Sequence, residues 1–193
     1  MYNIKNASTV PQTEIFSMHI SFRFLVLLLT SFILFIQCRH GEPANNKPGP
    51  DQLNESLIIA NQEALREENE QINDFIRRRS WDMNTTGTGL RIMITKHGSG
   101  AISEPGRTVK LSYTVTLLNG DTVYTALQEG PIIFEVGKGQ VISGLEEAIL
   151  MLRVGDHAKI IIPSHLAYGL IGDQKKILNK ASLVYDIEFI SIF

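Results

Sequence analysis

The sequence predicts an α+β fold in which an antiparallel β-sheet wraps around one short α-helix, with a long N-terminal helix before it. Residues 53–79 contain no proline or glycine and are rich in Glu, Gln, Asn, Ala, Leu and Arg, a composition that favours a long helix. Beyond Gly89, apolar and polar residues alternate over several short stretches, which indicates half-buried strands. A single short helical pattern lies between these strands. Strands, one helix and further strands in this order are typical of an α+β domain.

The individual elements follow from the apolar periodicity. In the longest strand, apolar residues stand at every second position from Val109 to Leu117, and Asn119-Gly120 follows as a turn. The short helix is expected over 143–152 and stops before Gly155. The connection over 163–181 is long, and a loop of that length in a compact domain is usually functional. The strands are expected at 90–94, 109–117, 132–136, 157–162 and 183–189.

The long helix has a thin apolar stripe. Ile58, Leu65 and Ile72 recur every seven residues, but Asn61 and Glu68 on the same seam are polar, so a strong coiled coil is not encoded. The helix is therefore interpreted as a spacer. The alternative is a weak dimerisation arm over residues 53–79.

The first part of the chain has the pattern of an export signal. Residues 24–36 form an apolar run broken only by Thr30 and Ser31, and Arg23 stands directly before it. This run suits the core of a signal peptide and is short for a membrane span, which needs about 20 residues. Cys38, the only cysteine of the chain, follows almost immediately.

The position of Cys38 resembles the lipobox of bacterial lipoproteins, in which the cysteine is lipidated and becomes the mature N-terminus. Phe35 and Gln37 stand where a lipobox favours leucine and a small residue, and the alternative is an uncleaved anchor with an incidental thiol. Both interpretations place the rest of the chain outside the cytoplasm. We expect a membrane-anchored lipoprotein of the cell envelope that faces the periplasm. The expected organisation is a signal peptide over 1–37, a tether over 38–52, a helical spacer over 53–84 and a globular domain over 85–193.

Composition and motifs argue against several classes of function. The formal charge of −2 is unlike that of a nucleic-acid-binding surface, so no nucleic-acid partner is expected. The five histidines and the single cysteine lack ligand spacing, so no metal is expected. The glycine-rich segment 137–144 fails as a nucleotide loop, because Ile142 replaces the third glycine of one fingerprint and Leu145-Glu146 replace the Lys-Ser/Thr pair of the other. No cofactor is therefore expected.

One resemblance extends over most of residues 108–189. It includes the motif Ala167-Tyr168-Gly169 and six other segments, 109–114, 119–120, 136–147, 151–156, 160–163 and 183–188. In this order and spacing they resemble the FKBP family of peptidyl-prolyl cis-trans isomerases. The lipidation motif followed by a helix also resembles the bacterial lipoprotein members of that family, including those associated with gliding motility.

The resemblance implies a prolyl isomerase that assists the folding of exported proteins and binds proline-containing polypeptide segments. Rotation about the Xaa-Pro bond needs no nucleophile, metal or cofactor, because the barrier arises from amide resonance. A dry apolar pocket disfavours the charge-separated planar amide relative to the twisted transition state. The alternative is a non-catalytic binding module or chaperone that uses the same fold to hold such segments.

The resemblance also implies the site residues. Tyr168, Ile142 and Tyr113 would carry the catalysis, with the Ile142 N–H and the Tyr168 hydroxyl each holding a substrate carbonyl. The remaining substrate-binding residues would be Val123, Ile132, Val141, Leu145, Ile177 and Tyr185.

Some of these positions depart from the family pattern. Leu145 stands where a tryptophan is usual, Val123, Ile132 and Tyr185 replace phenylalanines, and Tyr124 replaces an aspartate. The pocket stays apolar. We therefore expect isomerisation with a lower rate or an altered specificity.

Overall fold

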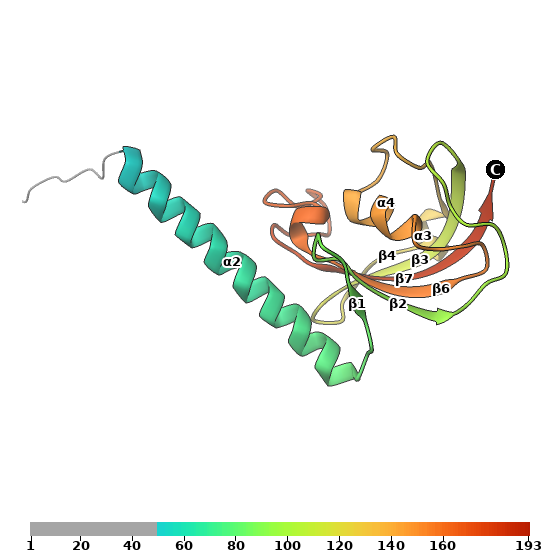
Figure 1. Cartoon of the computed structure of the whole chain (residues 1–193), viewed down its shortest axis with the longest axis horizontal. Coiled ribbons are helices and arrows are strands. Elements are labelled where there is room, and N and C mark those ends of the chain that lie inside the picture. Colours follow the sequence, from blue (N-terminus) through green and yellow to red (C-terminus); the bar gives the residue numbers. More distant parts are fainter. Residues whose placement is uncertain (1–49) are drawn as a thin grey trace, which may run out of the picture. The chain divides into compact units, whose positions relative to one another are not determined.

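The computed structural model describes residues 50–193, with side chains from Asn54 onward, and shows a curved antiparallel sheet around a short helix (Figure 1). This confirms the predicted fold class. Cys38, the predicted signal peptide over 1–37 and most of the predicted tether over 38–52 lie outside the described residues. The helices are α2 (Pro50–Arg79), α3 (Ala126–Glu129) and α4 (Ser143–Ile149), with a 3₁₀ turn at Ser164–Leu166. The strands are β1 (Asn84–Thr85), β2 (Arg91–Lys96), β3 (Thr108–Leu117), β4 (Thr122–Thr125), β5 (Ile132–Glu135), β6 (His157–Ile162) and β7 (Leu183–Ile192).

Strand β3 organises the sheet. The strands follow the order β1-β2-β6-β7-β3-β4, every pair is antiparallel, and β5 also pairs with β3. Strand β3 thus pairs with β7 along its length, with β4 near one end and with β5 near the other. Side chains from three other strands are therefore brought to the surface around β3, where the candidate site lies.

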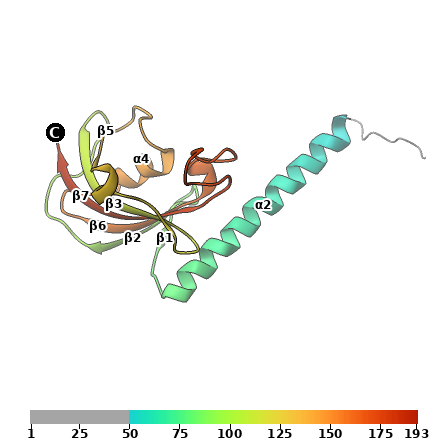
Figure 2. The ribbon, with the colours of Figure 1, turned by 180° about the vertical axis from the view of Figure 1, so that it is seen from behind.

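Helix α4 covers the concave side of the sheet, as both ribbon views show (Figures 1 and 2). Its residues Leu145, Ala148 and Ile149 are buried in the main core together with Ile160, Ile162 and other strand side chains. Gly144 lets the first turn approach the sheet, because a Cβ atom there would lie 2.4 Å from Cγ2 of Ile162. The helix ends at Ile149, earlier than the expected end at residue 152.

Three short elements were not predicted. Strand β1 has two residues, β4 four and α3 four, and segments of this length are too short to show an apolar period. Helix α3 has a local cause in the sequence, since the Thr125 side chain accepts a hydrogen bond from the Gln128 N–H at 3.3 Å. Strand β7 also continues to Ile192, beyond the expected end at residue 189.

The C-terminal part of α2 packs against the sheet face opposite to α4. Ile72 and Phe75 are buried in a second apolar cluster with Ile161 of β6 and Val184 of β7. Ile161 and Val184 are cross-strand partners. The interpretation of α2 as a free spacer is therefore wrong for its last turns, which belong to the folded domain.

A sequence signal for this contact was present in β6. A strand buried on one side alternates apolar and polar residues, whereas a strand covered on both sides shows a continuous apolar run. Ile160, Ile161 and Ile162 form such a run, and each of them is fully buried. Ile160 and Ile162 face the main core, while Ile161 faces α2.

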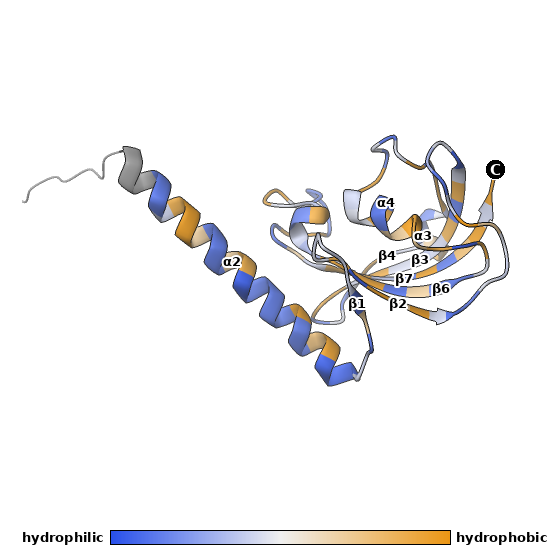
Figure 3. Cartoon of the chain, viewed as in Figure 1, coloured by the Kyte–Doolittle hydropathy of each residue, from blue (hydrophilic) through white to orange (hydrophobic). Residues whose placement is uncertain are grey.

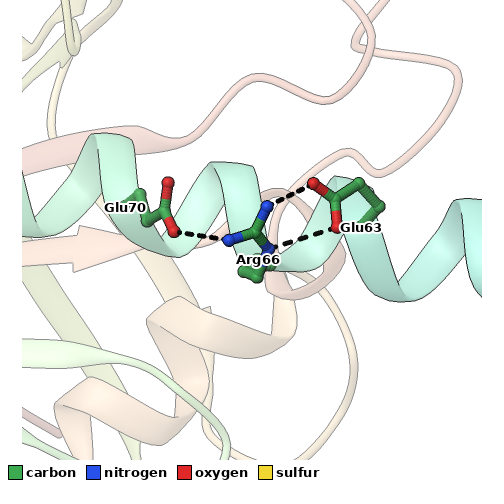
Figure 4. Close-up of polar contacts among 3 residues, drawn as sticks. All are labelled: Glu63, Arg66 and Glu70. Atoms are coloured by element: carbon green, nitrogen blue, oxygen red, sulfur yellow. Dashed lines mark hydrogen bonds and ion pairs between the residues drawn. The ribbon is translucent and has the colours of Figure 1, made fainter.

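The N-terminal part of α2 leaves its apolar side chains exposed among many polar ones (Figure 3). Leu57, Ile58 and Leu65 are about half exposed. On this part of the helix, Arg66 forms ion pairs with Glu63 at 2.5 Å and Glu70 at 3.2 Å (Figure 4). Pairs three and four residues apart support a helix that lacks tertiary contacts.

Within residues 50–193, no helix is both long and apolar enough to span a membrane.

The packing of α2 predicts different effects at its two ends. We expect Phe75→Ala to lower the free energy of unfolding by about 3 kcal/mol, because the aromatic ring is lost from a packed cluster. Leu57→Ala, at an exposed position of the same helix, should change it by less than about 0.5 kcal/mol. Urea unfolding of the purified protein measures both values. Equal small effects would show that α2 does not stabilise the domain.

Candidate active site

A cavity of about 380 Å³ opens between β3, β4, β5, β7 and the loop over 163–181. Four of the predicted site residues, Tyr113, Ile132, Tyr168 and Tyr185, lie around it. The other residues that line the cavity are Val115, Tyr124, Glu129, Asp173 and Lys175. The cavity thus combines an aromatic interior with a few charged groups.

Two tyrosines form one wall of this cavity. Tyr113 of β3 and Tyr185 of β7 have ring centroids 6.4 Å apart, with the rings tilted by 32°. Tyr185 is buried, and burial raises its pKa above the ordinary value of a tyrosine. Burial also raises the pKa of Tyr113, with a smaller effect from the charge of Glu129. Both hydroxyls therefore stay protonated at neutral pH, and the wall carries no charge.

Three other predicted residues lie in the core. Val123, Leu145 and Ile177 are buried in the same cluster as Tyr185. Val141 and Ile142 are partly buried and pack against that cluster. These five residues do not line the cavity itself, so their predicted contact with substrate remains a prediction.

Ile142 offers a backbone donor at the start of α4. It is the N-cap residue of this helix, and its carbonyl accepts hydrogen bonds from the N–H groups of Leu145 at 3.0 Å and Glu146 at 3.2 Å. Within residues 54–193, the Ile142 N–H itself donates to no acceptor. The donor that the family resemblance assigns to a substrate carbonyl therefore has no acceptor in the part of the chain that the structure describes.

Tyr168 lies on the loop over 163–181 and is 38% exposed. Its backbone neighbours are held by Ser164, whose carbonyl accepts hydrogen bonds from the N–H groups of Ala167 at 3.0 Å and Gly169 at 2.8 Å. Burial, and to a lesser degree the charge of Asp173, raises the pKa of Tyr168. The hydroxyl is thus a neutral hydrogen-bond donor at the cavity.

A hydrogen-bonded tyrosine–aspartate pair in the cavity lining was not predicted from the sequence. The Tyr124 hydroxyl donates to the carboxylate of Asp173, and this hydrogen bond raises the pKa of Tyr124 to about 12. Burial alone would raise the pKa of Asp173, but hydrogen bonds from Tyr124 and from the N–H groups of Ile177 and Lys175 keep it below its ordinary value. The pair ties β4 to the loop that carries Tyr168.

A local signal for Asp173 exists in the sequence. Its side chain accepts from N–H groups two and four residues later, which is the behaviour of aspartate in turns. The turn over 172–177 follows from this pattern. The pairing with Tyr124, which lies far away in the sequence, does not.

The domain is similar to proteins of a known family. Residues 100–190 match the family described as FKBP-type peptidyl-prolyl cis-trans isomerase. FK506-binding protein 2 of Dictyostelium discoideum is 41% identical over 91 residues, which are 47% of this chain and 68% of that protein. This chain belongs to the FKBP-type peptidyl-prolyl cis-trans isomerase family.

Other FKBP-type proteins support the assignment. Peptidyl-prolyl cis-trans isomerase FPR2 of Saccharomyces cerevisiae is 40% identical over 90 residues, which are 46% of this chain and 67% of the yeast protein. A crystal structure of AtFKBP13 superposes with a TM-score of 0.55 and 28% sequence identity, over 57% of this chain and 98% of that one. The family resemblance, the fold and the prolyl isomerase function predicted from the sequence are therefore confirmed.

The FKBP domain has the features that rotation about an Xaa-Pro bond requires, an apolar surface and hydrogen-bond donors. Its cavity is aromatic and contains the neutral hydroxyl of Tyr168. At the start of α4, the Ile142 N–H donates to no acceptor among residues 54–193. Within the described part of the chain, no cluster of three or more His, Cys, Asp or Glu side chains could hold a metal ion. Tyr124 lines the cavity, and its hydroxyl donates to Asp173.

The Tyr124–Asp173 pair predicts a dependence on pH. Because the pKa of Asp173 is lowered, the pair stabilises the fold fully above the ordinary aspartate value of 3.8, and this contribution is lost as the pH falls through the lowered value. Tyr124→Phe should raise the pKa of Asp173, which a ¹³C NMR titration of its carboxyl carbon measures. Glu63, on α2 and outside the cavity lining, provides the control, because the hydrogen bond from Arg66 that lowers its pKa is the same in both proteins. An unchanged Asp173 titration would contradict the pairing.

Proposed function

We propose that this FKBP domain isomerises Xaa-Pro bonds in the proline-containing segments of exported proteins. The observation that carries the proposal is the aromatic cavity lined by Tyr113, Tyr185 and Tyr168, with the Tyr168 hydroxyl as a neutral donor. The Ile142 N–H, which donates to no acceptor within residues 54–193, is a second donor at the start of α4. The family membership supports the reaction. The export pattern over 24–36 supports the class of substrate.

The catalysis follows from the properties of the amide. Rotation about the peptide bond has a barrier of about 18–20 kcal/mol, because the planar amide is stabilised by resonance with charge separation. The uncharged aromatic wall formed by Tyr113 and Tyr185 solvates this charge separation less than water does, and therefore favours the twisted amide. Each lowering of the barrier by about 1.36 kcal/mol increases the rate tenfold.

The two donors would fix the substrate while the bond rotates. The Ile142 N–H and the Tyr168 hydroxyl belong to different segments, the start of α4 and the loop over 163–181. Hydrogen bonds to carbonyls on both sides of the Xaa-Pro bond would hold the backbone in the geometry of the transition state. Proximity and orientation then contribute together with desolvation.

A second candidate function is the holding of apolar segments without turnover. Leu170, Ile171 and Leu178 on the loop over 163–181 are each more than 70% exposed. Exposed apolar side chains on one loop offer contacts to an apolar segment of another protein. These side chains lie outside the cavity lining, so holding and isomerisation use different residues.

Tyr168→Phe separates the two functions. We expect this variant to lower kcat/KM for short Xaa-Pro peptides about tenfold, because a hydrogen bond made in the transition state is lost. A protease-coupled isomerisation assay measures the rate. Leu170→Ala, on the same loop but outside the cavity, is the matched control and should retain the wild-type rate. No acceleration by the wild-type protein at micromolar concentration, with suppression of client aggregation intact, would favour the holding function.

We propose further that the protein is a lipoprotein of the cell envelope, similar to the bacterial lipoprotein members of the family. The support is the apolar run over 24–36 followed by Cys38, and the relatives described above, which are eukaryotic, do not bear on it. Acylation of Cys38 would anchor the domain at the periplasmic side of the membrane. We also propose a weak dimer through residues 53–79, because Leu57, Ile58 and Leu65 of α2 are exposed. Ile72 of the same seam is buried in the domain and would not take part.

Cys38→Ser tests the anchor. In bacterial cells grown with radiolabelled palmitate, we expect the wild-type protein to carry label and to sediment with membranes, whereas the variant carries none. Ser31→Ala, within the apolar run, is the control and should behave as wild type. Equal labelling of the Cys38→Ser variant would contradict lipidation at this residue.

A further inference from the structure

Glu68 of α2 binds both ends of the loop that carries Tyr168. One carboxylate oxygen accepts hydrogen bonds from the Ser164 N–H at 2.6 Å and the Ser182 hydroxyl at 2.5 Å, and the other accepts from the Ser164 hydroxyl at 3.0 Å. Ser164 and Ser182 are buried. Hydrogen bonds to a carboxylate are stronger than those between neutral groups, particularly away from bulk water.

The contact continues from Ser164 to Tyr168 through the backbone. The Ser164 carbonyl accepts from the N–H groups of Ala167 and Gly169, the two residues that flank Tyr168. On the other side of the loop, the Gly169 carbonyl accepts from the Lys180 N–H at 2.8 Å, two residues before Ser182. Both residues next to Tyr168 are therefore connected through backbone hydrogen bonds to the ends of the loop that Glu68 holds.

The position of Glu68 is itself fixed by packing. Ile72 and Phe75 follow it by four and seven residues, lie on the same face of α2 and are buried against β6 and β7. The adjacent Asn69 accepts a hydrogen bond from the buried Arg91 of β2 at 2.6 Å. The Glu68 carboxylate is therefore held on a rigid helix. Its hydrogen bonds to the loop explain why a glutamate stands on the apolar seam of α2.

We propose that Glu68 is a positioning residue that holds the loop over 163–181 so that the Tyr168 hydroxyl stays at the cavity. The proposal rests on the proposed isomerase function and makes α2 part of the active site's support. Without the carboxylate, two serines at the ends of the loop lose their acceptor. The loop then has more conformational freedom, and Tyr168 is less often in position to donate.

The test compares Glu68→Ala with Glu68→Gln and with Glu67→Ala, which removes the same charge from an exposed neighbouring position. We expect Glu68→Ala to lower kcat/KM about fivefold and Glu67→Ala to leave it unchanged. Glu68→Gln should restore part of the rate, because its amide oxygen still accepts from the Ser164 N–H. Amide hydrogen exchange over residues 164–182 should accelerate at least tenfold in Glu68→Ala and remain at the wild-type rate in Glu67→Ala.

A double variant shows whether Glu68 acts through Tyr168. In a Tyr168→Phe background the hydroxyl is already absent, so Glu68→Ala should lower the rate by less than about twofold. An equal loss in both backgrounds would overturn the proposal, as would wild-type exchange over residues 164–182 in Glu68→Ala. If the wild-type protein has no isomerase activity, the proposed function fails, and the exchange rates alone decide whether Glu68 holds the loop.

Discussion

The burial of the β6–β7 strand pair on both faces is the constraint on which the rest of this structure depends. One face of the pair packs with α4 and contributes Ile160, Ile162 and Tyr185 to the main core, while the other face packs Ile161 and Val184 against α2. Because neither strand can shift its register without moving apolar side chains into water, both layers are fixed together. The same two strands thus support the cavity, which Tyr185 of β7 lines, and hold the long helix α2 on the opposite face.

The site illustrates how a fold can promote a reaction without a reactive group. Tyr113 and Tyr185 form a neutral aromatic wall, and Ile142 and Tyr168 supply donors from segments that the sheet and α4 hold apart. The loop that carries Tyr168 has little regular structure of its own. Its order comes from contacts made elsewhere, with Asp173 bonded to Tyr124 on one side and Ser164 and Ser182 bonded to Glu68 on the other.

Much of the fold was predictable, because apolar periods are local. The long strand β3 and the short helix α4 each carry an apolar repeat that the sequence shows directly, and the buried strand β6 carries a continuous apolar run. For the candidate site, only the family resemblance indicated residues. Of these, Tyr113, Ile132, Tyr168 and Tyr185 lie around one cavity in the structure. The roles of Tyr124, Asp173 and Glu68 were not predictable, since each depends on a hydrogen bond to a residue at least 49 positions away along the chain.

In the proposed mechanism, the prolyl ring of a substrate enters the aromatic cavity. A short Xaa-Pro peptide with a ¹³C-labelled proline, bound to the protein, tests it most directly by intermolecular NOE measurements. We expect NOEs between the proline ring and the ring protons of Tyr113 and Tyr185. NOEs confined to the exposed side chains of Leu170, Ile171 and Leu178, with none to the two tyrosines, would contradict the account.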